Sequence, residues 1–348
     1  MINDLTNKLS LYEDLNYQEM SQAMDEILKG QIPPQQTADF LRNLTDKGES
    51  NQELLAMLDK MQQYAIHVLP KREGRIIDVC GTGGDKMKTF NVSTAAAFVI
   101  AAAGGTVAKH GNRSVSGVCG SADIFEYFGY DLNMTPERVT EIIEKFGIGF
   151  MFAQKFHPAM KNVAEARKML GTRTAFNLLG PLSNPAGVKN QLVGVFSPDY
   201  LERLVLLLKA RGAERVMTVI SHDGLDELST TSKNQICLLK DGKITLRILN
   251  PQDLGLVKAS LSEIQVSTRE EAIRAFVSVL KGTANKPMIE VTGLNAAAGL
   301  IICGISNDFQ DSTQIAMNTI RSGKAYELFK NFVRFCGQIS KVEEFEKS

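Results

Sequence analysis

The hydrophobic positions of the first seventy residues recur at the spacing of amphipathic helices, and no strand-like run interrupts them. Asn16, the Pro33-Pro34 pair and Ser50 each precede such a pattern, and Ser50 forms a capping-box sequence with Glu53. The predicted helices carry apolar stripes made of Met20, Met24, Ile27 and Leu28; of Ala38, Leu41 and Leu44; and of Leu54, Leu58, Met61 and Ala65. Residues 1–70 therefore predict a small helical domain, with residues 69–75 as a linker.

From residue 75 the pattern changes to short apolar runs that alternate with longer apolar segments. Residues 75–80 predict a buried strand, Ser93 is expected to cap a helix that ends at Gly104-Gly105, and residues 106–110 predict a second strand. Strand, helix and strand in this order form a βαβ unit with parallel pairing. Further strands are predicted at 148–153, 191–196 and 215–220, and Asp241-Gly242 is typical of a hairpin turn, which adds antiparallel strands. Further helices are expected after Ser121 and at 135–146, 157–171, 199–212, 267–280, 294–303 and 312–321.

The sequence thus predicts an α/β protein: a small all-helical domain plus a larger α/β domain with a mostly parallel mixed central sheet flanked by helices. Its 348 residues are 44% hydrophobic and 22% charged, which is typical of a soluble globular protein. Thirty-nine basic and 39 acidic residues give a net charge of 0, so no general attraction to nucleic acid or anionic membrane is expected. No apolar run reaches the ~18 residues that span a bilayer, and five scattered cysteines without a CxxC pattern indicate a reduced, cytoplasmic setting.

A glycine-rich segment follows the first predicted strand of the α/β domain. It contains Gly81, Gly83 and Gly84, and an Asn-x-Ser-Thr sequence at Asn91–Thr94 leads into the next helix. Glycines allow backbone N–H groups to approach an anion, and the start of a helix attracts negative charge. The segment matches neither the GxxxxGK[ST] nor the GxGxxG pattern. We expect an anion-binding loop; the alternative is a tight turn that needs glycine only for its backbone angles.

A second polar loop, residues 109–123, follows the next strand. It carries Lys109, Arg113 and several serines around glycines, so two donor-rich loops follow neighbouring strands. This arrangement suggests a ligand with two phosphate groups, whereas a solvated polar loop is the alternative. His110 has no evident partner for general-base chemistry, and a structural role is favoured.

One acidic segment and one arginine are further candidates for the site. The segment Asp223–Glu227 places three carboxylates after a strand, which suits Mg²⁺ bound together with phosphate; an acidic turn is the alternative. Arg167 lies on the same helical stripe as Met160 and Val163, where a buried guanidinium requires an anion. From the residues alone, an ordinary ion pair between Arg167 and a glutamate is the preferred interpretation.

Seven segments together resemble the anthranilate phosphoribosyltransferase family: GTGGD, TFNVSTAAAF, VAKHGNRSVSG, GSAD, HPAMKNVAEARKMLGTRTAFNLLGPLSNPAG, DGLDE and LNAAAG. The resemblance implies transfer of a phosphoribosyl group from phosphoribosyl pyrophosphate to anthranilate in tryptophan biosynthesis. It also implies a homodimer formed through the helical domain, and a helical domain of residues 1–70 that is rejoined by about 158–188. Residues 75–157 and 189–345 would form the domain that binds phosphoribosyl pyrophosphate.

The resemblance also implies roles for individual residues, none of which is a general acid or base. Anthranilate would contact Gly81, Asn112 and Arg167, and Mg²⁺, two ions per subunit, would use Ser93, Asp226 and Glu227. This implication replaces the ion-pair interpretation of Arg167. Phosphoribosyl pyrophosphate would contact Gly81, Gly84, Asp85, Thr89, Asn91, Val92, Ser93, Thr94, Lys109, His110, Gly111, Asn112, Arg113, Ser114, Val115, Ser116, Gly117 and Ser121.

The sequence departs from the family pattern at Val118 and Cys119, where polar residues are common, and at Ser221, which stands before His222 where a His-Gly pair is usual. The carboxylates of the acidic segment are intact, so we expect activity. Two alternatives share the architecture: a pyrimidine nucleoside phosphorylase, and a nucleic-acid-binding relative without transferase activity. The first should carry nucleoside-specific loops, and the second should carry a basic groove.

Overall fold

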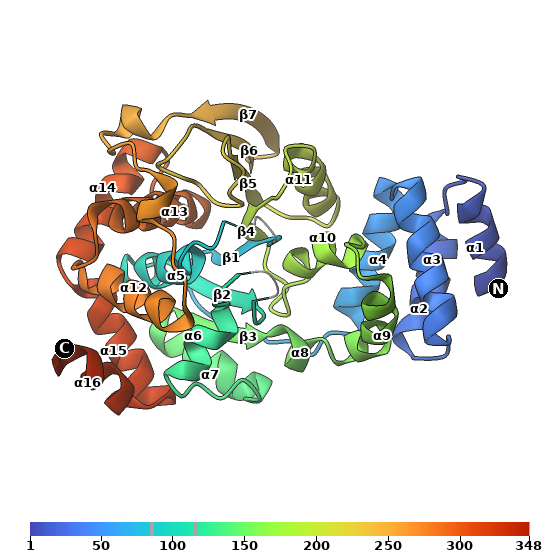
Figure 1. Ribbon diagram of the computed structural model, residues 1–348, viewed down its shortest axis with the longest axis horizontal. Coiled ribbons are helices and arrows are strands. Elements are labelled where there is room, and N and C mark those ends of the chain that lie inside the picture. The colour runs from blue at the N-terminus through green and yellow to red at the C-terminus, as the bar shows by residue number, and fades with distance from the viewer. Residues whose placement is uncertain (84–86, 115–116, 348) are drawn as a thin grey trace. The chain divides into compact units, whose positions relative to one another are not determined.

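The computed structural model describes residues 1–83, 87–114 and 117–347 (Figure 1). The chain forms two compact units, each of which is described by itself. The helical unit consists of Met1–His67 and Ala153–Gly187, and the α/β unit consists of Val68–Phe152 and Val188–Ser348. Each unit is thus assembled from two separate segments of the chain.

The helical unit contains the three helices predicted from the amino-terminal pattern, with the predicted caps at Asn16 and Ser50. The Asn16 side chain accepts the Glu19 N–H at 3.0 Å, and the Glu19 carboxylate accepts the Asn16 N–H at 2.8 Å. Three helices of this unit were not predicted: α8, α10 and α1, which has only Ile2, Leu5 and Leu9 as buried residues. The helices of this unit are α1 Ile2–Ser10, α2 Tyr17–Leu28, α3 Pro34–Lys47, α4 Asn51–Gln63, α8 Ala153–Phe156, the short 3₁₀ helix Pro158–Met160, α9 Lys161–Leu170 and α10 Ala175–Leu182.

The second segment of the helical unit is tied to the first by specific hydrogen bonds. The Asn162 side chain donates to the Leu28 carbonyl at 2.7 Å, which satisfies a carbonyl at the end of α2. The Ile66 N–H donates to the Phe156 carbonyl at 2.8 Å. Helix α9 packs against α3 and α2, so α9 belongs to the core of this unit.

The described strands of the α/β unit form one seven-stranded sheet of order β3-β2-β1-β4-β5-β6-β7. The first five strands in this order, from β3 through β2, β1 and β4 to β5, pair in parallel. Strands β5, β6 and β7 pair antiparallel, so the predicted mostly parallel mixed sheet is confirmed. The predicted hairpin turn is also confirmed, because Asp241 and Gly242 both have positive φ angles, 52° and 75°. The strands are β1 Ile76–Gly81, β2 Thr106–Gly111, β3 Ile148–Phe152, β4 Asn190–Gly194, β5 Arg215–Ser221, β6 Asn234–Lys240 and β7 Lys243–Leu249.

Helices cover the parallel part of the sheet. Helices α5 and α13 pack against β1 and against each other, and β5 lies between α13 and α11 (Figure 1). Burial on both faces explains why these strands are nearly continuous apolar runs. The helices of this unit are α5 Val92–Ala102, α6 Ser121–Tyr127, α7 Pro136–Phe146, α11 Tyr200–Ala210, α12 Arg269–Lys281, α13 Lys286–Cys303, α14 Phe309–Arg321, α15 Lys324–Cys336 and α16 Ile339–Lys347, with 3₁₀ turns at Pro251–Leu254 and Leu261–Glu263.

Several predicted helix starts were wrong; α14, for example, begins at Phe309 rather than at residue 312. Helix α5 begins at Val92 with Asn91 at the N-cap position, so Ser93 lies inside the helix, and α6 begins at Ser121 after Gly120. Helix α13 begins at Lys286 rather than Leu294; the Asn285 side chain caps it by accepting the Met288 N–H at 2.9 Å. Residues 290–303 are buried all round, so α13 lacks the one-sided pattern by which a helix is recognised in a sequence.

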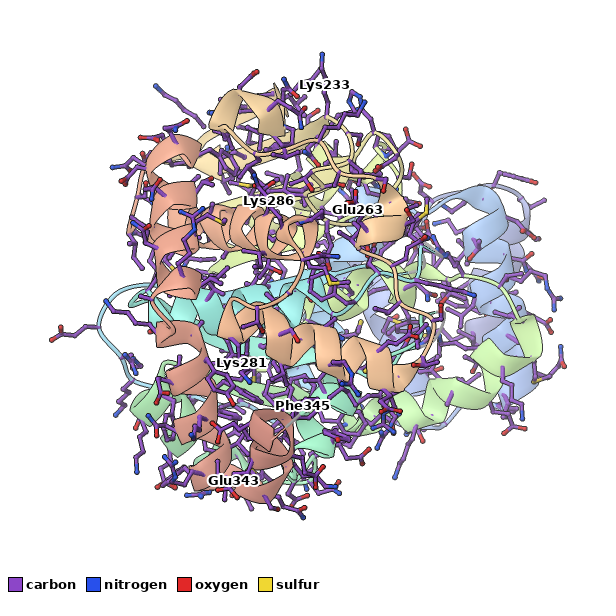
Figure 2. All side chains as sticks on the ribbon, turned by 60° about the vertical axis from the view of Figure 1, so that its left-hand side comes forward. Lys233, Glu263, Lys281, Lys286, Glu343 and Phe345 are labelled. Carbon is purple, nitrogen blue, oxygen red and sulfur yellow. The ribbon has the colours of Figure 1, made fainter. Side chains whose placement is uncertain are left out.

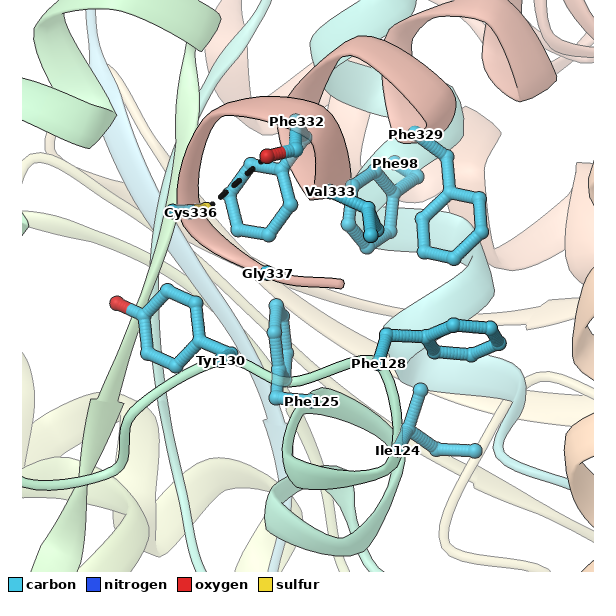
Figure 3. Close-up of a pocket in the computed structure, with 10 residues that line it drawn as sticks. All are labelled: Phe98, Ile124, Phe125, Phe128, Tyr130, Phe329, Phe332, Val333, Cys336 and Gly337. Carbon is cyan, nitrogen blue, oxygen red and sulfur yellow. Dashed lines mark hydrogen bonds between the residues drawn. The ribbon is translucent and has the colours of Figure 1, made fainter. Parts of the chain in front are cut away.

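Aromatic rings fill the core beside α15. Phe125 stacks on Phe150 with ring centroids 4.4 Å apart. Phe98 meets Phe329 and Phe332 edge to face (Figure 3). The space enclosed by the residues drawn there is about 10 Å³, which is about the size of one water molecule, so it is packing space and not a substrate site.

The surface of the α/β unit carries side chains of both charges (Figure 2). Lys281 Nζ donates to the Phe345 carbonyl at 3.1 Å, which ties α12 to α16, and Lys286 pairs with Glu290 within α13 at 3.5 Å. Among the described residues, no helix is both long enough and apolar enough to cross a membrane.

Candidate functional site

The acidic segment 223–227 meets the carboxyl ends of β1 and β4 at two glycines. Gly81 and Gly194 are partners in the β1–β4 register. A Cβ atom on Gly81 would lie 2.6 Å from Asp226 Oδ2, and one on Gly194 would lie 1.5 Å from the Asp226 backbone oxygen. Real Cβ atoms do not approach so closely: at Gly194 the conflict is with backbone, so β4 needs glycine, whereas at Gly81 the Asp226 side chain would have to move. The paired glycines thus create the space that Asp226 occupies.

Asp226 is also bonded to the glycine-rich loop. Its Oδ2 accepts the Gly83 N–H at 2.6 Å, and its side chain is buried, with the residue 8% exposed. The loop is held on its other side by Thr82, whose N–H donates to the Gly194 carbonyl at 2.9 Å and whose hydroxyl accepts the Phe196 N–H at 3.1 Å. The described start of the glycine-rich loop and the acidic segment therefore form one hydrogen-bonded structure.

Ser221, one of the two departures from the family pattern, anchors the base of this acidic segment. Its hydroxyl accepts the Leu225 N–H at 2.8 Å and donates to the Asp223 carboxylate, which also accepts from the Thr231 hydroxyl. Serine therefore keeps the segment tightly folded at this position.

Lys109 is a buried cation beside this structure. It is 1% exposed, and its Nζ donates to the Val79 carbonyl at 2.6 Å and to Ser93 Oγ at 3.3 Å. Burial lowers the pKa of Lys109, while the negative charges of Asp78 and Glu227 act in the opposite direction. The ammonium group is thus held against the start of α5, close to the acidic segment.

Asp78 and Lys109 replace backbone pairing between β1 and β2. In the described strands the β1–β2 register runs only through Ile76↔Thr106 and Ile77↔Val107, although both strands continue in register with their outer neighbours. Beyond that point Asp78 Oδ1 accepts the His110 N–H at 3.1 Å, and the Lys109 side chain satisfies the Val79 carbonyl. Asp78 is fully buried. These two side chains therefore satisfy backbone groups at the ligand end of the sheet.

The start of α5 carries the polar residues predicted to bind phosphate. Thr94 Oγ1 donates to Asn91 Oδ1 at 2.5 Å and lies 3.0 Å from the Ser121 hydroxyl, and Asn91 Nδ2 donates to the Cys119 carbonyl at 3.1 Å. Position 119 thus contributes its backbone rather than its thiol, and burial raises the pKa of that thiol to about 12. The first turns of α5 and α6 are joined at the predicted site.

Arg113, expected to contact pyrophosphate, is engaged by carboxylates of α6. Its guanidinium donates two parallel hydrogen bonds of 2.7 Å to Glu126 and one of 3.1 Å to Asp123, and the Glu126 contacts are the main reason that the pKa of Arg113 is raised. Asp123 also accepts the Gly120 N–H at 2.8 Å. To bind a phosphate with the same N–H groups, Arg113 has to exchange these partners.

Arg167 lies on α9 in the helical unit. Its Nη2 donates to Asn177 Oδ1 at 3.4 Å, and its guanidinium carbon is 5.8 Å from the centre of the Phe176 ring. Burial lowers its pKa. In the part of the chain that the structure describes, no aspartate or glutamate lies within 4 Å of this guanidinium, so the ion pair with a glutamate is not formed. Arg167 presents a half-buried cation beside an aromatic ring.

Within the described ranges, no three His, Cys, Asp or Glu side chains are grouped as a metal site. Ser93 Oγ lies 3.3 Å from Lys109 Nζ, the charge of Glu227 acts on Lys109, and Asp226 precedes Glu227 in the chain. These three residues supply hard oxygen atoms, a set that fits Mg²⁺ only if waters or phosphate oxygens complete it.

The structure places the described site residues in both units, with Arg167 in the helical unit and the other described ones in the α/β unit. Around the β1 and β2 ends lie Gly81, Asn91, Val92, Ser93, Thr94, Lys109, His110, Gly111, Ser121, Asp226 and Glu227. Thr89 bridges to Gln265, and Asn112, Arg113, Ser114 and Gly117 belong to the loop before α6. Gly84, Asp85, Val115 and Ser116 lie outside the described residues.

Sequence reasoning did not single out Gly194 or Asp78. Gly194 stood inside a predicted strand, where an isolated glycine is a known signal of close backbone approach. Asp78, a charged residue within an apolar strand, was a comparable signal.

Comparison with known families identifies both units. Residues 73–326 match the family described as "Glycosyl transferase family, a/b domain", and residues 3–65 match "Glycosyl transferase family, helical bundle domain". The first match covers well over half of the chain.

Individual relatives match along almost the whole length. An anthranilate phosphoribosyltransferase from Nitrosopumilus maritimus is 60% identical, with 99% of each chain covered. The crystal structure of anthranilate phosphoribosyltransferase from Thermus thermophilus superposes with a TM-score of 0.88 at 38% identity, covering 96% of this chain and 99% of that chain. The Saccharomyces cerevisiae enzyme, solved in complex with PRPP and Mg, superposes with a TM-score of 0.87 at 25% identity, covering 96% and 97%.

Proposed function

The chain belongs to the anthranilate phosphoribosyltransferase family, and we propose the following roles for its residues in the reaction of that family. The reaction moves the 5-phosphoribosyl group of phosphoribosyl pyrophosphate to the amine of anthranilate and releases pyrophosphate. The nucleoside phosphorylase and the nucleic-acid-binding relative are not supported by these relatives.

One observation supports the location of the sugar phosphate most directly. Asp226 is seated against Gly81 and Gly194 and accepts the Gly83 N–H, so the acidic segment is joined to the glycine-rich loop. Both lie at the carboxyl ends of parallel strands, where α/β folds bind ligands. We assign phosphoribosyl pyrophosphate to this end of the sheet, with the start of α5 and the loop before α6 as donors to its phosphates.

Magnesium is part of the proposal. Asp226, Glu227 and Ser93 would hold it, two ions per subunit, and phosphate oxygens and waters would complete its ligands. When bound, it would neutralise negative charge on the pyrophosphate group. The yeast relative was solved with PRPP and Mg, which supports this assignment.

Lys109 and Ser93 would orient the departing pyrophosphate. The Lys109 ammonium is fixed by the Val79 carbonyl at 2.6 Å, so its position is set before the substrate binds. A preorganised cation in a buried place stabilises negative charge that develops in the transition state without reorganising at that moment. Ser93, 3.3 Å from Lys109 Nζ, shares this position at the start of α5.

Arg167 would bind the carboxylate of anthranilate. A guanidinium that has no acidic partner among the described residues can donate two hydrogen bonds to a carboxylate, and the Phe176 ring beside it offers an aromatic surface. Asn112 and Gly81 complete the residues proposed to bind anthranilate.

The amine of anthranilate attacks as a neutral group with a free lone pair, so no general base is assigned. The residues act by binding and alignment.

The test of this function is the fluorescence of anthranilate. Purified protein with phosphoribosyl pyrophosphate and Mg²⁺ should remove the anthranilate signal, and omission of either component should preserve it. A protein that leaves the signal unchanged with all three present would not be this transferase.

We also propose a cytoplasmic homodimer that associates through the helical unit. The cysteines Cys80, Cys119, Cys237, Cys303 and Cys336 are free thiols, which supports a reducing compartment. Leu11 and Tyr12 of the helical unit are 70% and 71% exposed and offer apolar surface to a second copy. Light scattering of the protein and of a Leu11→Glu/Tyr12→Glu variant tests this, and a monomeric wild-type mass would exclude it.

A further inference from the structure

The segment LNAAAG, part of the family resemblance, has no role in the site described above, yet it contains a buried asparagine. Asn295 lies in the middle of α13 and is 3% exposed. Its Oδ1 accepts the Leu228 N–H at 3.1 Å, and its Nδ2 donates to the Leu228 carbonyl at 2.7 Å. Nδ2 also donates to the Val291 carbonyl at 2.9 Å, one turn earlier in α13. The amide thus holds both backbone groups of Leu228.

Leu228 directly follows Asp226 and Glu227, the proposed metal ligands. The next residue, Ser229, is held in the same way by Asn234 at the start of β6. Asn234 Oδ1 accepts the Ser229 N–H at 2.7 Å, and Asn234 Nδ2 donates to the Ser229 carbonyl at 2.9 Å. Two buried asparagine amides therefore fix two consecutive residues at the exit of the acidic segment.

An asparagine amide has the same donor and acceptor pair as a peptide group, so it can pair with a backbone residue as a neighbouring strand does. Leu228 is fully buried, and its N–H and C=O require partners. Helix α13 is a rigid support, because Gly293 and Gly299 let it pack closely: Cβ atoms there would lie 2.5 Å from Met317 Sδ and 2.2 Å from Ile100 Cδ1. The position of the acidic segment is thus set by a buried helix as well as by its own turn.

We propose that Asn295 is a positioning residue of the magnesium site: its amide fixes the backbone after Glu227, so that the two carboxylates face the metal and the pyrophosphate. This inference rests on the proposed function, because it presumes that Asp226 and Glu227 bind Mg²⁺. Partners that orient metal ligands commonly change metal affinity by about 10- to 100-fold when they are removed.

The test separates metal affinity from folding. Asn295→Ser deletes the two bonds to Leu228 but leaves a hydroxyl that can still donate to the Val291 carbonyl, as Thr292 already does to the Met288 carbonyl at 2.9 Å. Thr292→Val is the matched control, because it removes a buried hydrogen bond from the same helix without touching Leu228. Calorimetry measures the binding of inorganic pyrophosphate at a series of Mg²⁺ concentrations, and thermal unfolding without metal measures stability.

We expect Asn295→Ser to need about 10- to 100-fold more Mg²⁺ for the same pyrophosphate affinity, and Thr292→Val to match the wild type. A folded Asn295→Ser protein with wild-type Mg²⁺ dependence overturns the inference, and so does an equal shift in Thr292→Val. If Asn295→Ser does not fold, Asn295→Asp replaces it; this variant keeps an acceptor for the Leu228 N–H and loses the donor to the carbonyl. It should shift in the same direction, and wild-type binding by it overturns the inference.

Failure of the proposed function gives a different result. Wild-type protein that binds pyrophosphate with Mg²⁺ but leaves anthranilate fluorescence unchanged would refute the transferase reaction and leave the Asn295 comparison valid. Wild-type pyrophosphate binding that is independent of Mg²⁺ would refute both the metal assignment and the role of Asn295.

Discussion

The backbone of Gly194 packs directly against the backbone of Asp226: a Cβ atom on Gly194 would lie 1.5 Å from the Asp226 carbonyl oxygen. The contact involves backbone on the Asp226 side, so no side-chain rotation can relieve it. The position of Asp226, and with it the hydrogen bond from the Gly83 N–H, therefore depends on a residue in a buried strand that has no functional group.

Gly194→Ala should displace the acidic segment. Overpacking of this kind costs about 1–3 kcal/mol, and we expect a lower melting temperature together with a higher Mg²⁺ requirement for turnover. Gly180→Ala is the control, because a Cβ atom there meets nothing within 4 Å. Thermal unfolding and a Mg²⁺ titration of the fluorescence assay measure both effects. A Gly194→Ala protein with wild-type stability and Mg²⁺ response would show that the contact is not constraining.

The carboxylates themselves provide the next prediction. Asp226→Asn and Glu227→Gln keep size and shape but remove charge, so each should reduce turnover sharply at limiting Mg²⁺, and added Mg²⁺ should restore part of it. Asp241→Asn, in the exposed hairpin turn, is the charge-matched control. The assay is turnover against Mg²⁺ concentration at saturating substrates. Unchanged rates at limiting Mg²⁺ in both variants would remove these residues from the metal site.

Some of the features on which these predictions depend could be predicted from the sequence, and others could not. The sheet, the hairpin and the caps at Asn16 and Ser50 follow from local patterns: apolar runs, a turn pair and capping residues. The start of α13 was missed because a helix that is buried all round has no polar face to mark its period.

The site was less predictable than the fold, because its construction depends on contacts between distant parts of the chain. The carboxylate of Asp226 suggested a metal ligand. Its position against Gly81 and Gly194, however, depends on contacts among three separate segments of the chain. Asn295 pairs with Leu228 across 67 residues, and no spacing rule links them. Lys109 looked like a phosphate ligand, whereas its contact with the Val79 carbonyl depends on where the β1–β2 register ends.

A buried histidine should make stability depend on pH. The pKa of His157 is lowered to about 4: burial is the main cause, hydrogen bonds with the Ser183 and Met61 backbone act in the opposite direction, and the nearby His67 adds to the lowering. The unfolded chain takes up the proton near pH 6.5, whereas the folded protein does so only near pH 4. The unfolded state therefore binds more protons in this window, and stability falls as pH falls from 6.5 to 4, by about 3 kcal/mol at most.

Urea unfolding between pH 7 and pH 4 measures this effect. His157→Gln should flatten the pH dependence over that window, and His222→Gln, at an exposed position, should leave it as in the wild type. If His157→Gln loses stability on acidification as steeply as the wild type, other groups are responsible.

Arg167 is the residue whose replacement should distinguish the two substrates. Its guanidinium is half-buried on α9, contacts Asn177 Oδ1 at 3.4 Å and lies over the Phe176 ring. A charge-assisted hydrogen bond lost from such a place costs about 1.5–3 kcal/mol, so Arg167→Ala should raise the anthranilate KM roughly 10- to 150-fold. The KM for phosphoribosyl pyrophosphate should change much less, because Arg167 is assigned to the carboxylate of anthranilate alone.

Two further variants make this prediction specific. Arg167→Lys keeps the charge but loses the two-pronged donor geometry, so its anthranilate KM should be intermediate. Lys168→Ala removes an exposed cation from the next position of the same helix and should leave both KM values unchanged. Steady-state titration of each substrate with the other saturating gives the two KM values of each protein. If Arg167→Ala folds and keeps the wild-type anthranilate KM, Arg167 only supports Asn177, and the carboxylate of anthranilate is bound elsewhere.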